Sequence, residues 1–217
     1  MASENFENYL KGIYAIESEH GKVSTTLLSE YLRISAASVT EMIKKLADDG
    51  LITHEPYRGV RLTEIGRKQA LRIVRRHRLW ELFLVEILNY QWDEIHDEAE
   101  RLEHVTSEGM EQRLDKALGY PKIDPHGDPI PDVNGELEGT SCAALEEFHP
   151  GDTVRVIRVS DDDPDVLQHA SELGLELNKK ISVKKKLKFD GSMVVKVGAK
   201  ERFISQHVAS AIFVEAL

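Results

Sequence analysis

The chain has 217 residues, of which 41% are hydrophobic and 30% are charged, a composition typical of folded globular domains and not of disordered chains. Its single cysteine, Cys142, excludes an internal disulfide and favours a reducing compartment. The N-terminal residues lack the basic and apolar regions of a secretory signal, and the most apolar run, residues 79–88, is short and contains two glutamates. We therefore expect a cytoplasmic protein with no membrane partner.

The net charge of −10 is unevenly distributed along the chain. Residues 81–118 carry three Lys/Arg against eleven Asp/Glu, and residues 119–165 carry three against twelve. Residues 1–70 are nearly balanced, with nine against ten. An N-terminal domain of this kind can present a basic face to DNA although the whole chain is acidic. The acidic middle of the chain can supply the oxygen ligands that a divalent cation needs.

Residues 1–50 predict three helices. Apolar residues at near-helical spacing indicate a first helix over residues 4–18, which ends at His20-Gly21. Ser24 and Ser35 have the side chains that cap helix N-termini, so each is expected to begin a further helix. The third helix ends at Asp49-Gly50.

Two short strands follow, joined by a tight turn at Tyr57-Arg58-Gly59. Three helices followed by such a wing make a winged helix-turn-helix, a DNA-binding arrangement in which the third helix enters the major groove. The first turns of that helix expose small and hydroxylated side chains, which allow close approach to base edges, and nearby basic residues can neutralise phosphates. The expected DNA contacts are Thr25, Ser35, Ala37, Ser38, Thr40, Lys44 and Arg58.

Two longer helices are expected next, one from Thr63 to about Tyr90 and one over residues 93–117. On the second, His96, Glu100, Glu103 and His104 form a stripe about 100° wide, separate from the apolar stripe. His77 and Glu81 are a further pair, four residues apart on the first of these helices. Imidazole and carboxylate groups without a thiolate suit a hard or borderline divalent metal ion.

Beyond residue 119 the amino-acid composition changes. Prolines and glycines are frequent up to Pro150 and break any long element. Alternating segments rich in Val and Ile then predict strands at residues 152–159, 180–187 and 193–197, with a short helix at 165–173 and a hairpin turn at Asp190-Gly191. The C-terminal part is therefore expected to form a small β-barrel.

These motifs together resemble the diphtheria-toxin-repressor-type family of metal-dependent transcriptional regulators. The resemblance is carried by His77-Arg78-Leu79-Trp80-Glu81, by the run from His96 to His104, and by Gly127-Asp128-Pro129-Ile130-Pro131. It implies a mainly α fold with small β parts. The implied domains are a winged helix-turn-helix domain at residues 1–72, a helical dimerisation and metal-binding domain at 73–140, a linker at 141–150 and an SH3-like domain at 151–217.

The resemblance also implies two metal sites per subunit. In one, the ligands correspond to Asn8, Glu100, Glu103 and His104. In the other, they correspond to His77, Glu81 and His96 with a carboxylate of the third domain, here Asp163 or, as a second choice, Asp165. Some manganese-type members also use residues that correspond to Asp124 and His126. Glu100 stands where iron-type members have Cys, which favours Mn(II) over Fe(II), and Lys11 stands where some manganese regulators have a further carboxylate.

The leading hypothesis is therefore a homodimeric, metal-dependent repressor of manganese or iron homeostasis genes that binds a palindromic double-stranded DNA operator. It needs Mn(II) or Fe(II) but no small-molecule substrate, and it is not an enzyme. Two alternatives remain open at this point. One is a metallohydrolase built on the His/carboxylate cluster, although no partnered nucleophile is evident. The other is a winged-helix regulator that senses an organic ligand.

Overall fold

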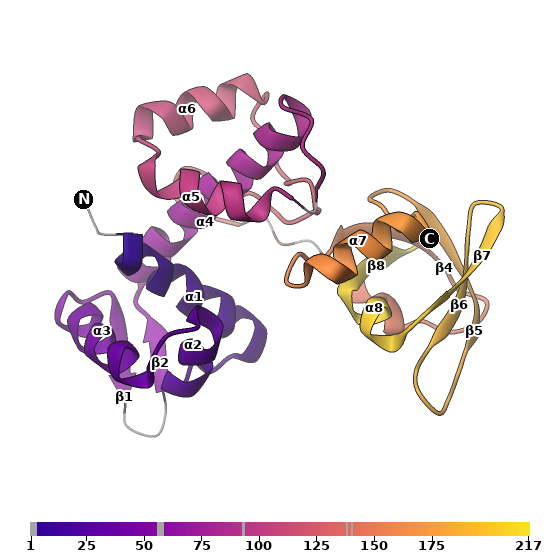
Figure 1. The fold of residues 1–217 in the computed structure, drawn as a ribbon, viewed down its shortest axis with the longest axis horizontal. Helices are drawn as coiled ribbons and strands as arrows, with labels where there is room; N and C mark the ends of the chain where they lie inside the picture. Colours follow the sequence, from indigo (N-terminus) through magenta and orange to yellow (C-terminus); the bar gives the residue numbers. More distant parts are fainter. Residues whose placement is uncertain (1–3, 56–58, 93, 138, 140) are drawn as a thin grey trace. The chain divides into compact units, whose positions relative to one another are not determined.

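The computed structural model describes residues 4–55, 59–92, 94–137, 139 and 141–217. The chain divides into two compact units (Figure 1). The first comprises Met1–Trp80, Ala99–Tyr120 and Ile130–Glu138, and the second comprises Glu81–Glu98, Pro121–Pro129 and Gly139–Leu217.

The N-terminal part of the first unit has the expected winged helix-turn-helix order. Ser24 Oγ accepts a hydrogen bond from Leu27 N at 3.1 Å, and Ser35 Oγ accepts one from Ser38 N at 3.1 Å, so both predicted N-caps are confirmed. Apolar side chains of the three helices and the hairpin share one core. The elements are α1 (Glu4–His20), α2 (Thr25–Leu32), α3 (Ala36–Asp48), β1 (Ile52–Glu55) and β2 (Gly59–Leu62).

The helices that follow differ from the prediction in two respects. The long helix α4 (Glu64–Glu86) begins after Thr63, whose Oγ1 accepts from Gly66 N, but it ends before Tyr90. The single helix expected over residues 93–117 is wrong, because the structure has α5 (His96–Val105) and α6 (Glu108–Ala117) in its place. Ser107 separates them, because its Oγ caps α6 by accepting from Met110 N at 3.2 Å.

The C-terminal part of the second unit is a six-stranded antiparallel sheet in the order β3-β8-β4-β5-β6-β7, with a core of its own. The three predicted strands and the short helix are confirmed, whereas β3, β7, α8 and β8 were not predicted. Segment 141–150, which we expected to be a linker, contains β3 and the completely buried Leu145. The elements are β3 (Ala143–Ala144), η1 (Leu145–Glu147), β4 (Thr153–Val159), α7 (Pro164–Leu173), β5 (Lys180–Lys186), β6 (Met193–Val197), β7 (Lys200–Ile204), α8 (Gln206–Ala211) and β8 (Ile212–Ala216).

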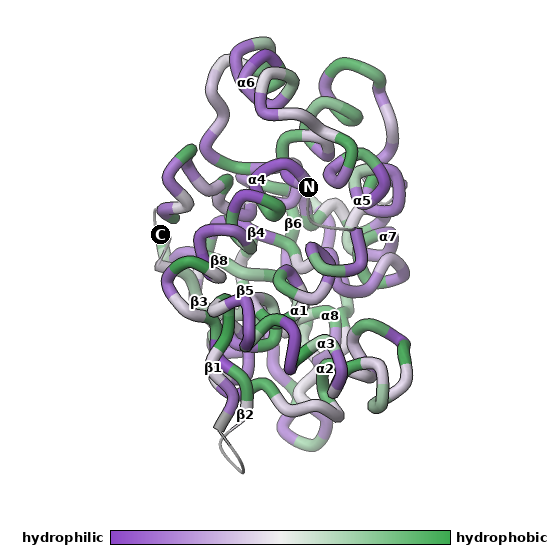
Figure 2. Tube along the Cα trace, turned by 90° about the vertical axis from the view of Figure 1, so that its left-hand side faces the viewer, coloured by the Kyte–Doolittle hydropathy of each residue, from purple (hydrophilic) through white to green (hydrophobic). Residues whose placement is uncertain are grey.

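Figure 2 colours each residue by its hydropathy, and the helices contain both hydrophobic (green) and hydrophilic (purple) segments. Among the described residues, no helix is both long enough and apolar enough to cross a membrane.

Candidate metal centres and DNA interface

The first candidate centre lies on one face of α5. Glu100, Glu103 and His104 each place one ligand atom within 4.8 Å of the others, and we call these three residues the α5 cluster. Their spacing of three and four residues puts them on the same side of the helix. The Glu103 side chain is completely buried and that of His104 is 5% exposed. A buried carboxylate is costly unless cations or hydrogen-bond donors surround it.

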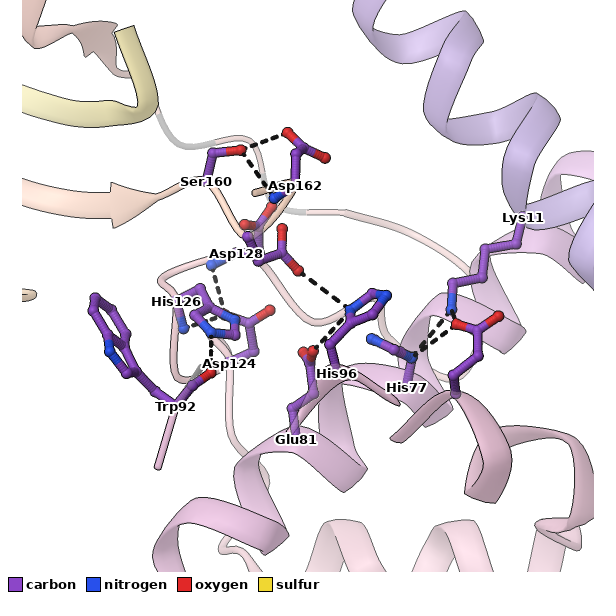
Figure 3. A network of polar contacts seen from close by, with 12 residues as sticks. Lys11, His77, Glu81, Trp92, His96, Asp124, His126, Asp128, Ser160 and Asp162 are labelled. Atoms are coloured by element: carbon purple, nitrogen blue, oxygen red, sulfur yellow. Dashed lines mark hydrogen bonds and ion pairs between the residues drawn. The ribbon is translucent and has the colours of Figure 1, made fainter. Parts of the chain in front are cut away.

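Lys11, from α1, supplies such a cation. Its Nζ donates to Glu100 Oε2 at 2.6 Å and to Glu103 Oε2 at 2.8 Å, and Figure 3 shows the Lys11 side chain pointing toward His77. His77 Nδ1, from α4, lies 2.6 Å from Glu103 Oε2. Burial alone would lower the pKa of Lys11, but the charges of Glu103 and Glu100 outweigh burial and raise this pKa above its ordinary value. The lysine is therefore a fixed positive charge.

One buried nitrogen of the α5 cluster, on His104, and one buried oxygen of α1, on Asn8, suit a metal ion. His104 Nδ1 lies 2.7 Å from Glu7 Oε2, and because a carboxylate accepts hydrogen bonds, this nitrogen carries the proton. His104 Nε2 is then a lone-pair donor, and within the described part of the chain it has no hydrogen-bond partner. The same is true of the Asn8 side-chain oxygen. A carboxylate that orients an imidazole in this way is the usual support for a metal-binding histidine.

The second candidate centre lies in the second unit. Glu81, Asp124 and His126 are all buried and place ligand atoms within 4.8 Å of one another. Glu81 makes a similar group with His96 and Asp161. We call these five residues the Glu81 cluster. His96 Nδ1 lies 3.7 Å from Glu81 Oε1 and 3.9 Å from Asp161 Oδ2 (Figure 3).

His126 is held so that one ring nitrogen faces carboxylates. Its Nε2 lies 3.0 Å from the Trp92 carbonyl oxygen, which can only accept, so Nε2 carries a proton. Its Nδ1 is buried and has no hydrogen-bond partner among the described residues. Burial alone would lower the pKa of His126, but Glu81, Asp161 and Asp124 together outweigh burial and raise it. The same negative charges favour a metal cation at this nitrogen.

The loop that carries Asp124 and His126 is fixed by its backbone. Asp124 Oδ1 accepts from the backbone N–H groups of His126 and Asp128, at 2.8 and 2.9 Å. The His126 carbonyl accepts from Val159 N at the end of β4. Gly127 has φ of +93°, and a Cβ atom there would lie 2.1 Å from the Ile157 carbonyl oxygen. Only glycine therefore fits between this loop and β4 without displacement.

The expected third-domain ligand, Asp163, is placed elsewhere. Its Oδ1 accepts from Asp165 N and caps α7, and its Oδ2 lies 3.4 Å from His207 Nε2. Asp161 is the carboxylate that the structure groups with Glu81 and His96. His77, which the resemblance puts in the second site with Glu81 and His96, has its Nδ1 2.6 Å from Glu103 Oε2.

Sequence reasoning missed Glu7, Asp161 and the contacts of Lys11. Glu7 stands directly before the expected ligand Asn8, and Asp161 is in the same run of aspartates as Asp163. Their positions next to expected ligands are the only features of the sequence that could have indicated Glu7 and Asp161.

The expected DNA-contacting residues of α3 lie on the surface. Ser35, Ala37, Ser38, Thr40 and Lys44 are exposed, whereas Val39, Ile43 and Leu46 on the opposite face are buried. Thr25, at the start of α2, is half-buried, and Arg58 lies outside the described residues. Thr40 Oγ1 donates to the Ala36 carbonyl at 2.8 Å and can still accept a hydrogen bond. This face is small, polar and suited to a major groove.

Comparison with known proteins decides the family. Residues 1–60 match the family model described as the iron dependent repressor N-terminal DNA binding domain, residues 63–132 match the iron dependent repressor metal binding and dimerisation domain, and residues 143–216 match the FeoA domain. The iron-dependent repressor IdeR of Mycobacterium leprae is 33% identical over 189 residues, which are 82% of this chain and 82% of that protein. The chain belongs to the diphtheria-toxin-repressor family of iron- and manganese-dependent repressors.

Solved structures agree over nearly the full length. A manganese-dependent transcriptional repressor in complex with manganese superimposes with a TM-score of 0.92 at 40% identity, and covers 98% of this chain and 100% of its own. The manganese regulator SloR superimposes with a TM-score of 0.80 at 33% identity, with 98% of each chain covered.

The resemblance and fold class expected from the sequence are thus confirmed. The protein is a metal-dependent, DNA-binding transcriptional repressor that takes a divalent metal ion and forms a homodimer. Its relatives are repressors and not enzymes, so the repressor is favoured over both the metallohydrolase and the sensor of organic ligands.

Proposed function

We propose that this repressor responds to Mn(II), with Fe(II) as the second candidate, and that each subunit binds two ions. The single observation that carries the proposal is a buried histidine nitrogen beside carboxylates that has no hydrogen-bond partner among the described residues, and each cluster has one such nitrogen. All the ligand atoms offered are oxygen or nitrogen. Such donors suit Mn(II), whereas a thiolate would favour softer metals. The named manganese-dependent relative supports the same choice.

For the first ion we propose the ligands Asn8, Glu100, Glu103 and His104. Glu7 accepts a hydrogen bond from His104 Nδ1 and so leaves Nε2 as the nitrogen that can bind the ion. Asn8 belongs to α1 of the DNA-binding domain, whereas the other three ligands belong to α5. A divalent ion held by these residues would supply positive charge that attracts ligands from both helices. The DNA-competent arrangement of α1 and α5 is then favoured by population shift.

For the second ion we propose Glu81, Asp124 and His126, with His96 and Asp161 completing the set. Asp161 takes the place that we first expected Asp163 to fill. These ligands come from the end of α4, the start of α5, the loop before Pro129 and the segment after β4. An ion there would join the C-terminal sheet to the helices that carry the other ligands within this unit.

We further propose that the dimer binds a palindromic operator of manganese or iron homeostasis genes in the cytoplasm. The two-fold axis of a dimer sets the spacing of the two half-sites. Exposed hydroxyl groups of α3 support base contacts by Ser38 and Thr40, and Lys44 and Arg58 are proposed to contact phosphates.

Counting the bound ions tests the two sites. Mn(II) is titrated into the full-length protein under anaerobic conditions, and the heat and the free Mn(II) are measured. We expect two ions per chain in the wild type and one in either His104→Ala or His126→Ala. His207→Ala is the matched control, because His207 is exposed and contacts Asp163 outside both clusters. Two ions bound in either of the first two variants would contradict the assignment of that site.

A further inference from the structure

A lysine lies against the two glutamates of the α5 cluster, so a positive charge is present there without a metal ion. Only 14% of the Lys11 side chain is exposed. Its Nζ donates to Glu100 Oε2 and to both oxygens of Glu103, and lies 3.1 Å from His77 Nδ1. Lys11 belongs to α1, His77 to α4 and the glutamates to α5, so one ammonium group connects three helices (Figure 3).

We propose that Lys11 is a built-in cation of the metal sensor, which holds α1 against α5 before metal arrives and raises the Mn(II) concentration at which the α5 cluster fills. The proposal rests on the metal site described under the proposed function. It adds a residue that sets the threshold of that site and is not itself a metal ligand.

The charges explain both effects. Glu100 and Glu103 carry two negative charges, and Lys11 neutralises one of them at hydrogen-bond distance. Without the ammonium the carboxylates would repel each other, and a buried carboxylate would lack its cation. With the ammonium, an arriving divalent ion meets a repelling charge and a smaller net attraction. Lys11 therefore stabilises the metal-free protein and weakens the attraction of the α5 cluster for a divalent ion.

The contacts also explain how the lysine and an ion can act at one cluster. Lys11 Nζ contacts His77 Nδ1, Glu100 Oε2 and both carboxylate oxygens of Glu103. His104 Nε2 and the Asn8 oxygen, which are buried and have no hydrogen-bond partner in the described part of the chain, take no part in these contacts. His104 Nε2 lies 3.5 Å from Glu103 Oε1. Glu103 Oε1, which also accepts from Lys11 at 3.1 Å, can thus be shared between the lysine and one ion.

The test uses the full-length chain with His126→Ala, so that only the α5 cluster is titrated. Three variants are compared in this background. Lys11→Gln removes the charge, Lys11→Arg keeps it, and Lys68→Gln is the matched control, because Lys68 is exposed and pairs with Glu64 on α4. Mn(II) affinity is measured by the electron paramagnetic resonance of free Mn(II). The thermal midpoint of unfolding is measured with chelator and again with saturating Mn(II).

We expect Lys11→Gln to bind Mn(II) at least about tenfold more tightly than its parent, because one repelling charge is gone. Its thermal midpoint should fall in chelator and recover with Mn(II). Lys11→Arg and Lys68→Gln should match the parent in affinity. Unchanged or weaker Mn(II) binding by Lys11→Gln would overturn the proposal, as would failure of Mn(II) to restore its midpoint. If the parent binds no Mn(II), the metal site itself is wrong and both proposals fall.

Discussion

Arg75 is the residue whose loss should most weaken the first unit. The arginine, on α4, is 5% exposed. Its Nε lies 3.2 Å from Glu111 Oε1, its second terminal nitrogen lies 2.7 Å from Asp115 Oδ2, and its first donates to the Pro131 carbonyl at 2.7 Å. One side chain thus satisfies two carboxylates of α6 and the backbone at Pro131. We predict that Arg75→Met strongly destabilises this unit.

The contacts set the expected magnitude. Removal of one partner of a buried ion pair costs about 3–5 kcal/mol, because the remaining charge is left uncompensated. Glu111 keeps its bond to Arg76 at 2.9 Å, so Asp115 is the main uncompensated group and a loss of about 3 kcal/mol is expected. Arg72 provides a matched comparison, because its pair with Glu108 is exposed. Arg72→Met should cost less than about 1 kcal/mol.

Urea unfolding in chelator, at one protein concentration, measures both losses. Trp92→Phe leaves Trp80 as the single tryptophan, and Trp80 lies in the first unit with its Nε1 bonded to Thr106. For a slope of about 2 kcal/mol per M, Arg75→Met should lower the urea midpoint by about 1.5 M. Equal midpoints for Arg75→Met and Arg72→Met would refute the reasoning.

Three further outcomes are expected. Asp161→Asn should weaken Mn(II) binding by tenfold or more, in the range seen when groups that support a metal are lost (~10–100-fold). Asp163→Asn should leave Mn(II) binding unchanged. Calorimetric titration measures both affinities, and the reverse order would contradict the choice of Asp161 as the ligand. Gly127→Ala should lower the thermal midpoint of the second unit and its Mn(II) affinity together, because its Cβ atom would strike the Ile157 carbonyl; a wild-type midpoint would contradict this. Ser38→Ala should weaken specific operator binding by about 1 kcal/mol, measured by fluorescence anisotropy, and leave nonspecific binding unchanged.

Much of the fold could be predicted because local signals coincide with it. Ser24 and Ser35 cap helices through bonds to nearby backbone groups, and such bonds depend on a few consecutive residues. The break before α6 has a comparable signal in Ser107, but the continuous pattern of polar residues concealed it. Strands β3 and β8 pair across about 70 residues, since Ala143 lies opposite Val214. Pairing at that separation depends on tertiary packing and leaves little trace in either strand.

The residues of the candidate metal sites also differ in whether they could be predicted from the sequence. Glu100, Glu103 and His104 could be predicted because helical spacing alone puts them on one face. Asp161 could not be chosen over Asp163 from the sequence, since only the turn before α7 decides that Asp163 caps the helix. The position of Lys11 against α5 is also invisible in the sequence, because the contact joins residues about ninety positions apart.

Metal-dependent operator binding tests the central claim most directly. DNA selected from a random duplex library with Mn(II) present is labelled, and its anisotropy is followed as the full-length protein is added anaerobically with Mn(II), Fe(II) or chelator. The wild type should bind tightly with Mn(II) or Fe(II) and weakly with chelator, and His104→Ala should remain weak throughout while it stays dimeric. Equal affinity of the wild type with chelator and with Mn(II) would contradict the account.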